Sequence, residues 1–348
     1  MIGYWVLIGI PILLSLVALS KNKLKLSLFV VELFYILFIG LRYEVGPDRE
    51  AYLNKYDTIA TLSFTEALSY TEAGYASLNW VLAQMDSGMY WVNFMVAIIF
   101  VSGLIRFAKT TPLPFIALVS VTPYLVIAIG MSAARQSAAI GLVFHLMASW
   151  RQGLANKLSL SVLAVSFHYS AVMSFVFVMQ SIKMPVWLRV GLLMASAVAV
   201  YPIFSATDAF DKYNQTYLEK NIVSAGALMH ALLNVIPAII YLIYRHKWKS
   251  RFGESDLLPM LAILSILSIF GVSISSTGID RLALYLSPIQ MIVYGSLPFL
   301  FGRKHKKTLS LLIIIYQLII LFWWLNFSNH AADGFLPYNN LIIHWLFD

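Results

Sequence analysis

The chain has 348 residues, of which 60% are hydrophobic and 11% are charged, and its mean hydropathy is +0.79. A soluble domain of this length needs a largely polar exterior, so the composition excludes a soluble globular protein. The absence of cysteine excludes disulfides, thiol catalysis and cysteine zinc sites. The net charge of +8 could indicate an anionic partner such as nucleic acid, and the positions of the charges along the chain decide this.

Repeated apolar runs of about 17–25 residues are typical of membrane-spanning helices. They predict ten spans, at residues 3–20, 24–41, 90–108, 112–130, 133–149, 185–204, 226–244, 257–277, 281–301 and 308–327. The first run has neither a basic n-region nor a small-residue cleavage site, so we expect a span and not a cleaved signal peptide. Between and after the spans lie a polar loop at 42–89 with an amphipathic helix expected near 72–87, a loop at 205–225 and a tail at 328–348. We therefore predict an all-α polytopic integral membrane protein with a single membrane domain, residues 1–348.

Residues 157–180 are long enough to span, but His168, Tyr169 and Ser170 interrupt their middle. The positive-inside rule distinguishes the two possible topologies. If this segment enters and returns as a re-entrant helix pair, 17 of the 24 Lys and Arg residues face the cytoplasm, whereas a spanning segment leaves only ten there. We predict the re-entrant pair, with the loops 42–89 and 205–225 and the tail in the periplasm. Because most of the positive residues lie in the predicted cytoplasmic loops, the positive net charge reflects membrane topology and does not indicate nucleic-acid binding.

Three arginines lie at the predicted outer ends of different helices: Arg42, Arg135 and Arg281. A guanidinium group is a rigid fork of donors that matches phosphate oxygens. Arg135 also lies in the first turn of its helix, where free backbone amides favour an anion, and small neighbours permit close helix packing. We predict that the three arginines bind a diphosphate. The alternatives are anchoring to lipid headgroups and, for Arg281, pairing with Asp280.

Two residues are candidates for acid–base catalysis. His168 lies at the tip of the re-entrant pair, where non-helical backbone must line a cavity or be buried in protein, and histidine accepts protons near neutral pH. Asp48 follows Gly46 and Pro47, which predict a tight turn near Arg42. A structural histidine and a solvated loop acid remain the alternatives. The other histidines are expected at the membrane interface, apart from His145, which is expected to face a neighbouring helix.

Tyrosines and carboxylates on the predicted outer side suggest glycan contacts, because aromatic rings stack on sugars and carboxylates accept hydroxyl protons. The predicted glycan-binding residues are Tyr43, Glu44, Tyr52, Tyr213, Tyr217, Asp280 and Tyr285. The outer loops contain no Asp-x-Asp, the usual carboxylate pair for a divalent cation, so no metal is expected.

Five segments follow one another along the chain: GLRYEVGPDREAYLNKYD, SAARQSAAIGLVFHLMA, FHYSAVMSFVF, IDRLALYLSPIQ and FLPYNN. In order and spacing they resemble segments of the EpsG-like, Wzy-type polysaccharide polymerases. Pro47 departs from the small polar residue that such proteins often carry. The resemblance implies a metal-independent, cofactor-free glycosyltransferase of the bacterial inner membrane. Its donor and acceptor would both be undecaprenyl-diphosphate-linked oligosaccharides, which it joins into a polysaccharide on the periplasmic side.

The resemblance also implies roles for the candidate residues and further partners. Arg135 and Arg281, with Arg42, would neutralise the diphosphate leaving group, and His168 or Asp48 would accept the proton of the acceptor hydroxyl. The expected partners are the lipid bilayer, a flippase and a chain-length regulator. Two other classes stay open, a flippase or transporter for the same lipid-linked sugars, which would be expected to show paired repeats and a midplane site, and a membrane O-acyltransferase acting on surface glycans.

Overall fold

A computed structural model describes residues 1–182, 185, 188, 226–253, 256–273 and 276–347. Over these residues the chain forms helices and no β-strand. In chain order the helices are α1 (Ile2–Leu16), α2 (Lys21–Gly40), α3 (Arg49–Thr61), α4 (Phe64–Tyr70), α5 (Ala73–Gln84), α6 (Met89–Ala108), α7 (Pro114–Val121), the π-helix η1 (Thr122–Ile129), α8 (Gly130–Ser132), α9 (Ala134–Ala148), α10 (Leu154–Phe167), the 3₁₀-helix η2 (Tyr169–Val172), α11 (Met173–Gln180), α14 (Ala227–Ile243), α15 (Arg245–Phe252), α16 (Leu257–Val272), α17 (Ser276–Ala283), the 3₁₀-helix η4 (Leu284–Leu286), α18 (Pro288–Leu300), α19 (Arg303–Phe327), α20 (Asn329–Phe335) and α21 (Leu341–Phe347). The predicted all-α class is confirmed for the described part of the chain.

The described residues do not confirm the ten membrane spans that the sequence predicts. Among the described residues, four helices are long and apolar enough to cross a bilayer, at Met89–Ala108, Pro114–Ser132, Gly278–Leu300 and Lys304–Phe327. A fifth is added if α14 and α15, bent by 78°, count as one span. Helices α1, α9 and α16 lie at predicted spans but have only 15, 15 and 16 residues, fewer than the about 20 that a span needs. The predicted span 185–204 and the loop 205–225 lie outside the described residues, apart from 185 and 188.

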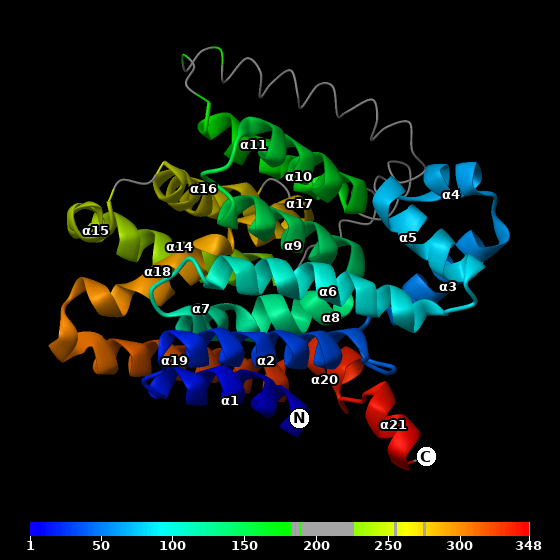
Figure 1. Cartoon of the computed structure of the whole chain (residues 1–348), viewed down its shortest axis with the longest axis horizontal. Helices are drawn as coiled ribbons and strands as arrows, with labels where there is room; N and C mark the ends of the chain where they lie inside the picture. The colour runs from blue at the N-terminus through cyan, green and yellow to red at the C-terminus, as the bar shows by residue number, and fades with distance from the viewer. Residues whose placement is uncertain (183–184, 186–187, 189–225, 254–255, 274–275, 348) are drawn as a thin grey trace.

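The long helices lie alongside one another, with different elements at the two ends of the bundle (Figure 1). Helices α3–α5 and α20 lie at one end, which we call the loop end. Helix α15 and the turn between α18 and α19 lie at the opposite end, which we call the basic end because it carries RHKWKSRF and RKHKK. The amphipathic helix expected near 72–87 is α5. The segregation of basic residues at one end agrees with the charge pattern on which the predicted topology depends.

The start of the first loop is held against the C-terminal tail. The backbone N–H of Tyr43 donates to the carbonyl of Asn339 at 3.0 Å, and the N–H of Gly46 donates to the carbonyl of Gly334 at 2.7 Å. Gly46 has φ +112°, and a Cβ there would lie 2.6 Å from the carbonyl oxygen of Met131, so only glycine fits this turn. The turn delivers Asp48 to the N-terminus of α3, next to α8.

The chain reverses direction at His168. Helix α10 ends at Phe167, His168 has extended backbone, and η2 leads into α11. Figure 1 shows α11 lying back beside α10, so that His168 is at the tip of the pair and points toward the loop end. The reversal has the shape of the predicted re-entrant pair, and its placement in a membrane stays a prediction.

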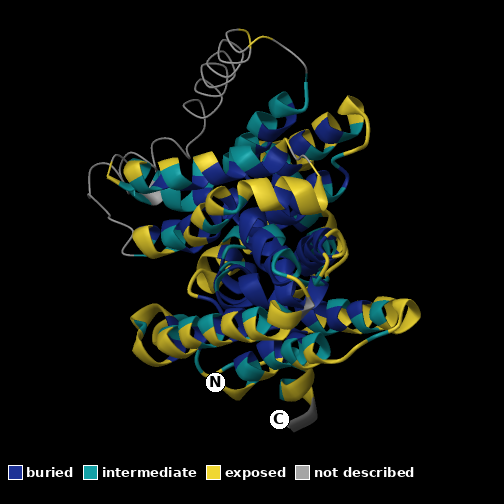
Figure 2. Ribbon diagram, turned by 90° about the vertical axis from the view of Figure 1, so that its left-hand side faces the viewer, coloured by how far each residue is buried: buried dark blue, intermediate teal, exposed yellow. Residues whose placement is uncertain are grey.

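Buried residues gather on the central helices, whereas the peripheral helices carry exposed residues on their outer faces (Figure 2). Helices α6 and α9 pack so closely that a Cβ on Gly103 or Gly141 would collide with the backbone of the opposite helix. The small residues of α9 therefore serve close packing, as their pattern predicts. The prediction that His145 faces a neighbouring helix is confirmed, since its Nε2 lies 3.1 Å from Ser102 Oγ on α6.

Candidate active site

A cavity of about 900 Å³ lies at the loop end, between α3, η1, α9, α14, α17, α19 and α20. Six of the residues singled out in the sequence line it: Asp48, Tyr52, Arg135, His168, Asp280 and Arg281. They come from segments more than 200 residues apart in the chain. The fold thus brings two of the three predicted phosphate ligands and both candidate bases to one cavity.

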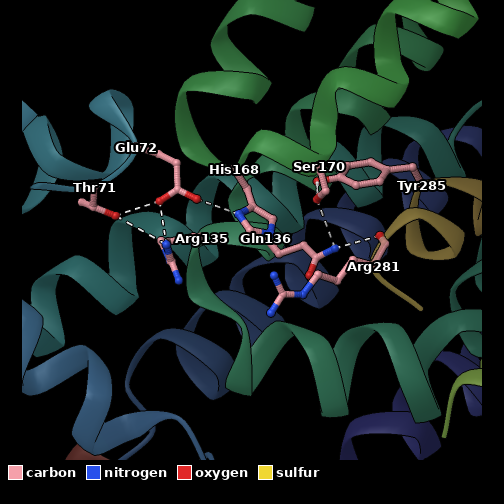
Figure 3. A network of polar contacts seen from close by, with 8 residues as sticks. All are labelled: Thr71, Glu72, Arg135, Gln136, His168, Ser170, Arg281 and Tyr285. Atoms are coloured by element: carbon pink, nitrogen blue, oxygen red, sulfur yellow. Dashed lines mark hydrogen bonds and ion pairs between the residues drawn. The ribbon is translucent and has the colours of Figure 1, made fainter. Parts of the chain in front are cut away.

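Glu72, which the sequence analysis did not single out, joins two of these residues (Figure 3). Its Oε2 accepts a hydrogen bond from Arg135 Nη1 at 2.6 Å and another from the hydroxyl of Thr71 at 2.7 Å. Its Oε1 lies 2.8 Å from His168 Nδ1. The side chain of Glu72 is only 3% exposed, so this carboxylate is a buried counterion shared by an arginine and a histidine.

The environment of Glu72 keeps it ionised. Burial alone would raise its pKa, but the hydrogen bond to His168 and the positive charge of Arg135 together hold the pKa well below its ordinary value. An ionised carboxylate has no proton to donate, so the proton between Glu72 and His168 is on Nδ1. The other ring nitrogen, Nε2, is then the basic nitrogen of a neutral His168.

The position of Glu72 follows from close contact between α5 and the end of α10. Glu72 is the N-cap residue of α5, where the free backbone amides of a helix favour a negative charge. A Cβ on Gly74 would lie 3.0 Å from the carbonyl oxygen of Ser166, so glycine allows the first turn of α5 to pack directly on α10. Because α10 ends one residue after Ser166 and His168 follows directly, this contact sets Glu72 beside His168.

Arg135 is held by protein groups and does not extend to the molecular surface as a lipid anchor would. In addition to its bond with Glu72, its guanidinium lies over the ring of Tyr52, 5.9 Å from the centroid. The side chain is 30% exposed and lines the cavity. A guanidinium that is fixed on one side by Glu72 and open to a cavity on the other is available to an anionic ligand.

Gln136 connects Arg281 to the tip of the α10–α11 pair. Its Nε2 donates to the carbonyl oxygen of Arg281 at 2.9 Å and lies 3.5 Å from the hydroxyl of Ser170. Ser170 in turn lies 3.1 Å from the hydroxyl of Tyr285. Figure 3 shows the guanidinium of Arg281 turned toward the side on which Arg135 lies. Tyr285 is buried and is not among the residues that line the cavity, and its hydroxyl supports η2 through Ser170.

Arg42 does not join the other two arginines. It is 5% exposed, donates to the carbonyl of Ile39 at 2.8 Å and to Asn93 Oδ1 at 2.9 Å, and is not among the residues that line the cavity. Its guanidinium stabilises the end of α2 against α6. The expectation that all three arginines share one site therefore holds only for Arg135 and Arg281.

The remaining predicted residues are distributed differently. Asp48 lines the cavity and accepts a hydrogen bond from the Ser132 hydroxyl at 3.0 Å. Tyr43 stacks on His344, with ring centroids 4.3 Å apart, and Glu44 forms an exposed ion pair with Arg49, so neither lines the cavity. Tyr213 and Tyr217 lie outside the described residues.

Two histidines that the sequence analysis assigned only to the membrane interface line the cavity. His230 pairs through Nδ1 with Asp280 and stacks on Tyr124, with ring centroids 3.9 Å apart. His330 lines the cavity from α20. Tyr124 belongs to the π-helix η1, a rare element that is frequently found at functional sites. Nothing in the one-dimensional pattern distinguished these histidines from the others near helix ends.

The cavity contains donor groups that suit an anion. Within the described residues, no group of three or more His, Asp or Glu side chains is arranged to hold a metal ion. The cavity is lined by the guanidinium groups of Arg135 and Arg281 and by the carboxylates of Asp48 and Asp280, and Glu72 beside them is already paired. The site can therefore bind a phosphate-bearing ligand and offer a histidine base next to it.

The fold and the cavity define a class, an all-helical membrane protein with an arginine–histidine site at one end of its bundle. Comparison with family models makes the assignment more specific, because the model of the EpsG family matches residues 25–340. The match covers nearly the whole chain, and the protein belongs to the EpsG family. The family indicates a membrane protein of the polysaccharide polymerase type. Comparison with curated proteins and with solved structures gives no match.

Proposed function

We propose that this protein is an integral-membrane glycosyltransferase of the bacterial inner membrane that joins undecaprenyl-diphosphate-linked oligosaccharide repeats into a polysaccharide on the periplasmic side. The observation that carries the proposal is the single cavity that combines Arg135 and Arg281 with the His168–Glu72 pair. The predicted topology supports the periplasmic side, because the basic end would face the cytoplasm and the cavity lies at the opposite end.

The reaction would break the bond between the anomeric carbon of the donor glycan and its diphosphate. Arg135 and Arg281 would bind the diphosphate and stabilise the negative charge that develops on the leaving oxygen. A hydroxyl oxygen of the acceptor sugar would form the new bond to the anomeric carbon, and its proton would move to His168 Nε2. The products are the extended glycan on the acceptor lipid and undecaprenyl diphosphate. A single direct displacement inverts the anomeric centre.

Of the two candidate bases, His168 is supported better than Asp48. A histidine beside an ionised carboxylate is held in one orientation, with its second ring nitrogen left to accept a proton, and Glu72 provides this carboxylate at 2.8 Å. Asp48 already accepts a hydrogen bond from Ser132. We propose that Asp48 and Asp280 bind the glycan by accepting hydrogen bonds from its hydroxyl groups, and that the ring of Tyr52 stacks on a sugar ring.

The neighbouring steps would need partners. A flippase would deliver the lipid-linked repeat to the outer leaflet, and a chain-length regulator would limit polymer growth. The cation that stabilises the diphosphate in this proposal is arginine, so the enzyme is expected to be metal-independent and to need no cofactor.

The glycans of a strain from which the gene has been deleted test the proposal directly. A polymerase predicts that a single repeat unit appears where the polysaccharide was, and that expression of the intact chain restores the polymer while the His168→Ala variant does not. Lipid-linked repeats retained inside the cell would indicate a flippase, and a full-length polymer lacking acyl groups would indicate an O-acyltransferase. Either of these two results would contradict the proposal.

A further inference from the structure

Three apolar side chains line the cavity and are widely accessible. They are Met229 on α14, 48% exposed, and Ile319 and Trp323 on α19, 61% and 52% exposed. Exposure this high at the wall of a cavity indicates that the cavity is open there. We therefore take the gap between the two helices that carry these residues as an opening on the flank of the cavity, in addition to its polar interior.

The opening differs in chemistry from the interior. Its walls are Met229 and Leu233 of α14 and Ile319, Ile320 and Trp323 of α19. None of these side chains carries a charge, whereas Arg135, His168 and Arg281 lie inside. Their neighbours on α14 and α19 include other exposed apolar residues, such as Leu228 and Phe322. In water such a surface would be unfavourable, but it is suited to contact with lipid chains.

The predicted topology would place the opening at the depth of one bilayer leaflet. Ile319 is eight residues before Phe327, the end of α19, which is about 12 Å along a helix. Leu233 is six residues after Ala227, the start of α14, which is about 9 Å. Both helix ends lie at the loop end. With these ends at the membrane boundary, the opening would face the acyl region of the adjacent leaflet, since half of a hydrocarbon core is about 15 Å thick, and Trp323 would lie where aromatic rings favour the interface.

We propose that the gap between α14 and α19 is the lateral entrance through which a polyprenyl chain leaves the cavity for the bilayer while its diphosphate is bound at Arg135 and Arg281. The identification of the ligand as a polyprenyl diphosphate rests on the proposed function. The occupant must have an anionic head for the arginines and a long apolar chain for the gap. A bilayer phospholipid shares this chemistry, so the test has to separate the two lipids.

Site-directed photo-crosslinking provides the test, because the chain contains no cysteine. The variants Met229→Cys and Ile319→Cys place a single thiol in the gap. The matched controls Leu228→Cys and Leu312→Cys place it on the same two helices, at side chains that are 51% and 56% exposed but do not line the cavity. Each thiol is labelled with a benzophenone maleimide in nanodiscs that contain radiolabelled undecaprenyl diphosphate, and the cross-linked radioactivity is measured.

The proposal predicts roughly tenfold more cross-linking at positions 229 and 319 than at 228 and 312. This ratio corresponds to a preference of about 1.4 kcal/mol of the polyprenyl chain for the gap over the rest of the helix surface. Excess unlabelled undecaprenyl diphosphate should compete, and excess phosphatidylglycerol should not. Equal labelling at all four positions, or equal competition by phosphatidylglycerol, would overturn the proposal. The measurement requires no glycosyl transfer, so a protein that fails to polymerise but cross-links selectively would contradict the proposed function and leave the entrance intact.

A second measurement links the entrance to the arginines. The Arg281→Gln variant, combined with each cysteine and compared at equal amounts of monodisperse protein, should lose most of the selective cross-linking at 229 and 319. Selective cross-linking that is unchanged in Arg281→Gln would mean that the lipid in the gap is not held by its diphosphate, and would overturn the assignment.

Discussion

The two walls of the cavity are built in opposite ways. On the α5–α10 side, Glu72 is buried and joins Arg135 and His168 through hydrogen bonds of 2.6 and 2.8 Å. On the α14–α19 side, Met229 and Ile319 are half-exposed and apolar. The first wall fixes the direction of side chains, since every polar group of a buried network needs its partner. The second imposes no direction and leaves the cavity open.

The difference between the two walls corresponds to the two parts of a lipid-linked sugar, the reacting glycan and the apolar lipid chain. Chemistry at an anomeric carbon needs a base and a charge at defined positions, because misplacement of a catalytic group is costly in rate. A polyprenyl chain needs only an apolar passage. We therefore expect substitutions in the buried wall to affect the rate of polymerisation strongly and substitutions in the open wall to affect lipid binding. The predictions that follow are ordered by the size of the expected effect on rate.

The largest effect is expected for His168→Ala. Loss of a general base lowers rates by about 10²–10⁴-fold, so polymerisation of lipid-linked repeats by the purified variant should fall by that factor while donor binding is retained. His145→Ala is the matched control, because His145 bonds to Ser102 on α6 and does not line the cavity. Near-normal activity of His168→Ala would leave Asp48 as the base.

The second effect concerns Glu72→Gln, which keeps the shape of the side chain and removes its charge. Without the carboxylate, His168 loses its orientation and its proton on Nδ1 is no longer favoured, so we expect kcat to fall by roughly 10²-fold, within the range for a general base. A negative neighbour favours the imidazolium, so its removal should move the acidic limb of the pH–rate profile to lower pH. A merely structural Glu72 would lower the amount of folded enzyme and leave the pH profile in place.

The third effect concerns Arg135→Lys. Lysine keeps the charge and the ion pair with Glu72 but loses the planar fork. We expect normal abundance and a loss of polymerisation of at least about tenfold, roughly 1.4 kcal/mol of transition-state stabilisation. Arg49→Ala, which removes an exposed cation in the same loop region, should stay close to wild type. Full activity of Arg135→Lys would show that charge alone is sufficient and that no bidentate contact is made.

The sequence revealed those site residues whose type is rare in an apolar setting. Arg135 and His168 interrupt membrane segments, where a charged or titratable group is costly without a function, and both line the cavity. Glu72 escaped notice because an acid in a polar loop is unremarkable before its burial is known. Arg42 was misplaced for the complementary reason, since a pattern gives its depth along α2 but not the face to which its guanidinium turns.

The sequence predicted those features of the fold that depend on a local pattern better than those that depend on the exact ends of helices. The amphipathic helix α5, the close packing of α9 and the reversal at His168 depend on local pattern, and the sequence predicted them. The number of spans depends on where each helix begins and ends. Helices α1, α9 and α16 are shorter than their apolar runs, because neighbouring turns and breaks consume part of each run.

A smaller effect on the site is expected for Arg42→Gln. Because Arg42 bonds to Ile39 and Asn93 away from the cavity, the variant should lower thermal stability, measured by the unfolding midpoint in detergent. Removing a buried charge that is paired by hydrogen bonds costs on the order of 1–3 kcal/mol. The KM for the lipid-linked donor, measured on the folded fraction, should not change. A clear rise in KM at unchanged stability would return Arg42 to the diphosphate site.

No effect is expected from removal of divalent cations. In the proposed reaction the charge of the leaving diphosphate is met by the guanidinium groups of Arg135 and Arg281, so there is no step in which Mg²⁺ or Mn²⁺ would add a missing charge. Purified enzyme should therefore elongate lipid-linked repeats equally in excess chelator and in added Mg²⁺. The product length distribution on a gel provides the measurement, and a magnesium-dependent glycosyltransferase assayed in the same buffers verifies that the chelator works. A requirement for either metal would mean that the arginines alone do not neutralise the diphosphate, and Asp48 and Asp280, the carboxylates that line the cavity, would then be the first candidates for its ligands.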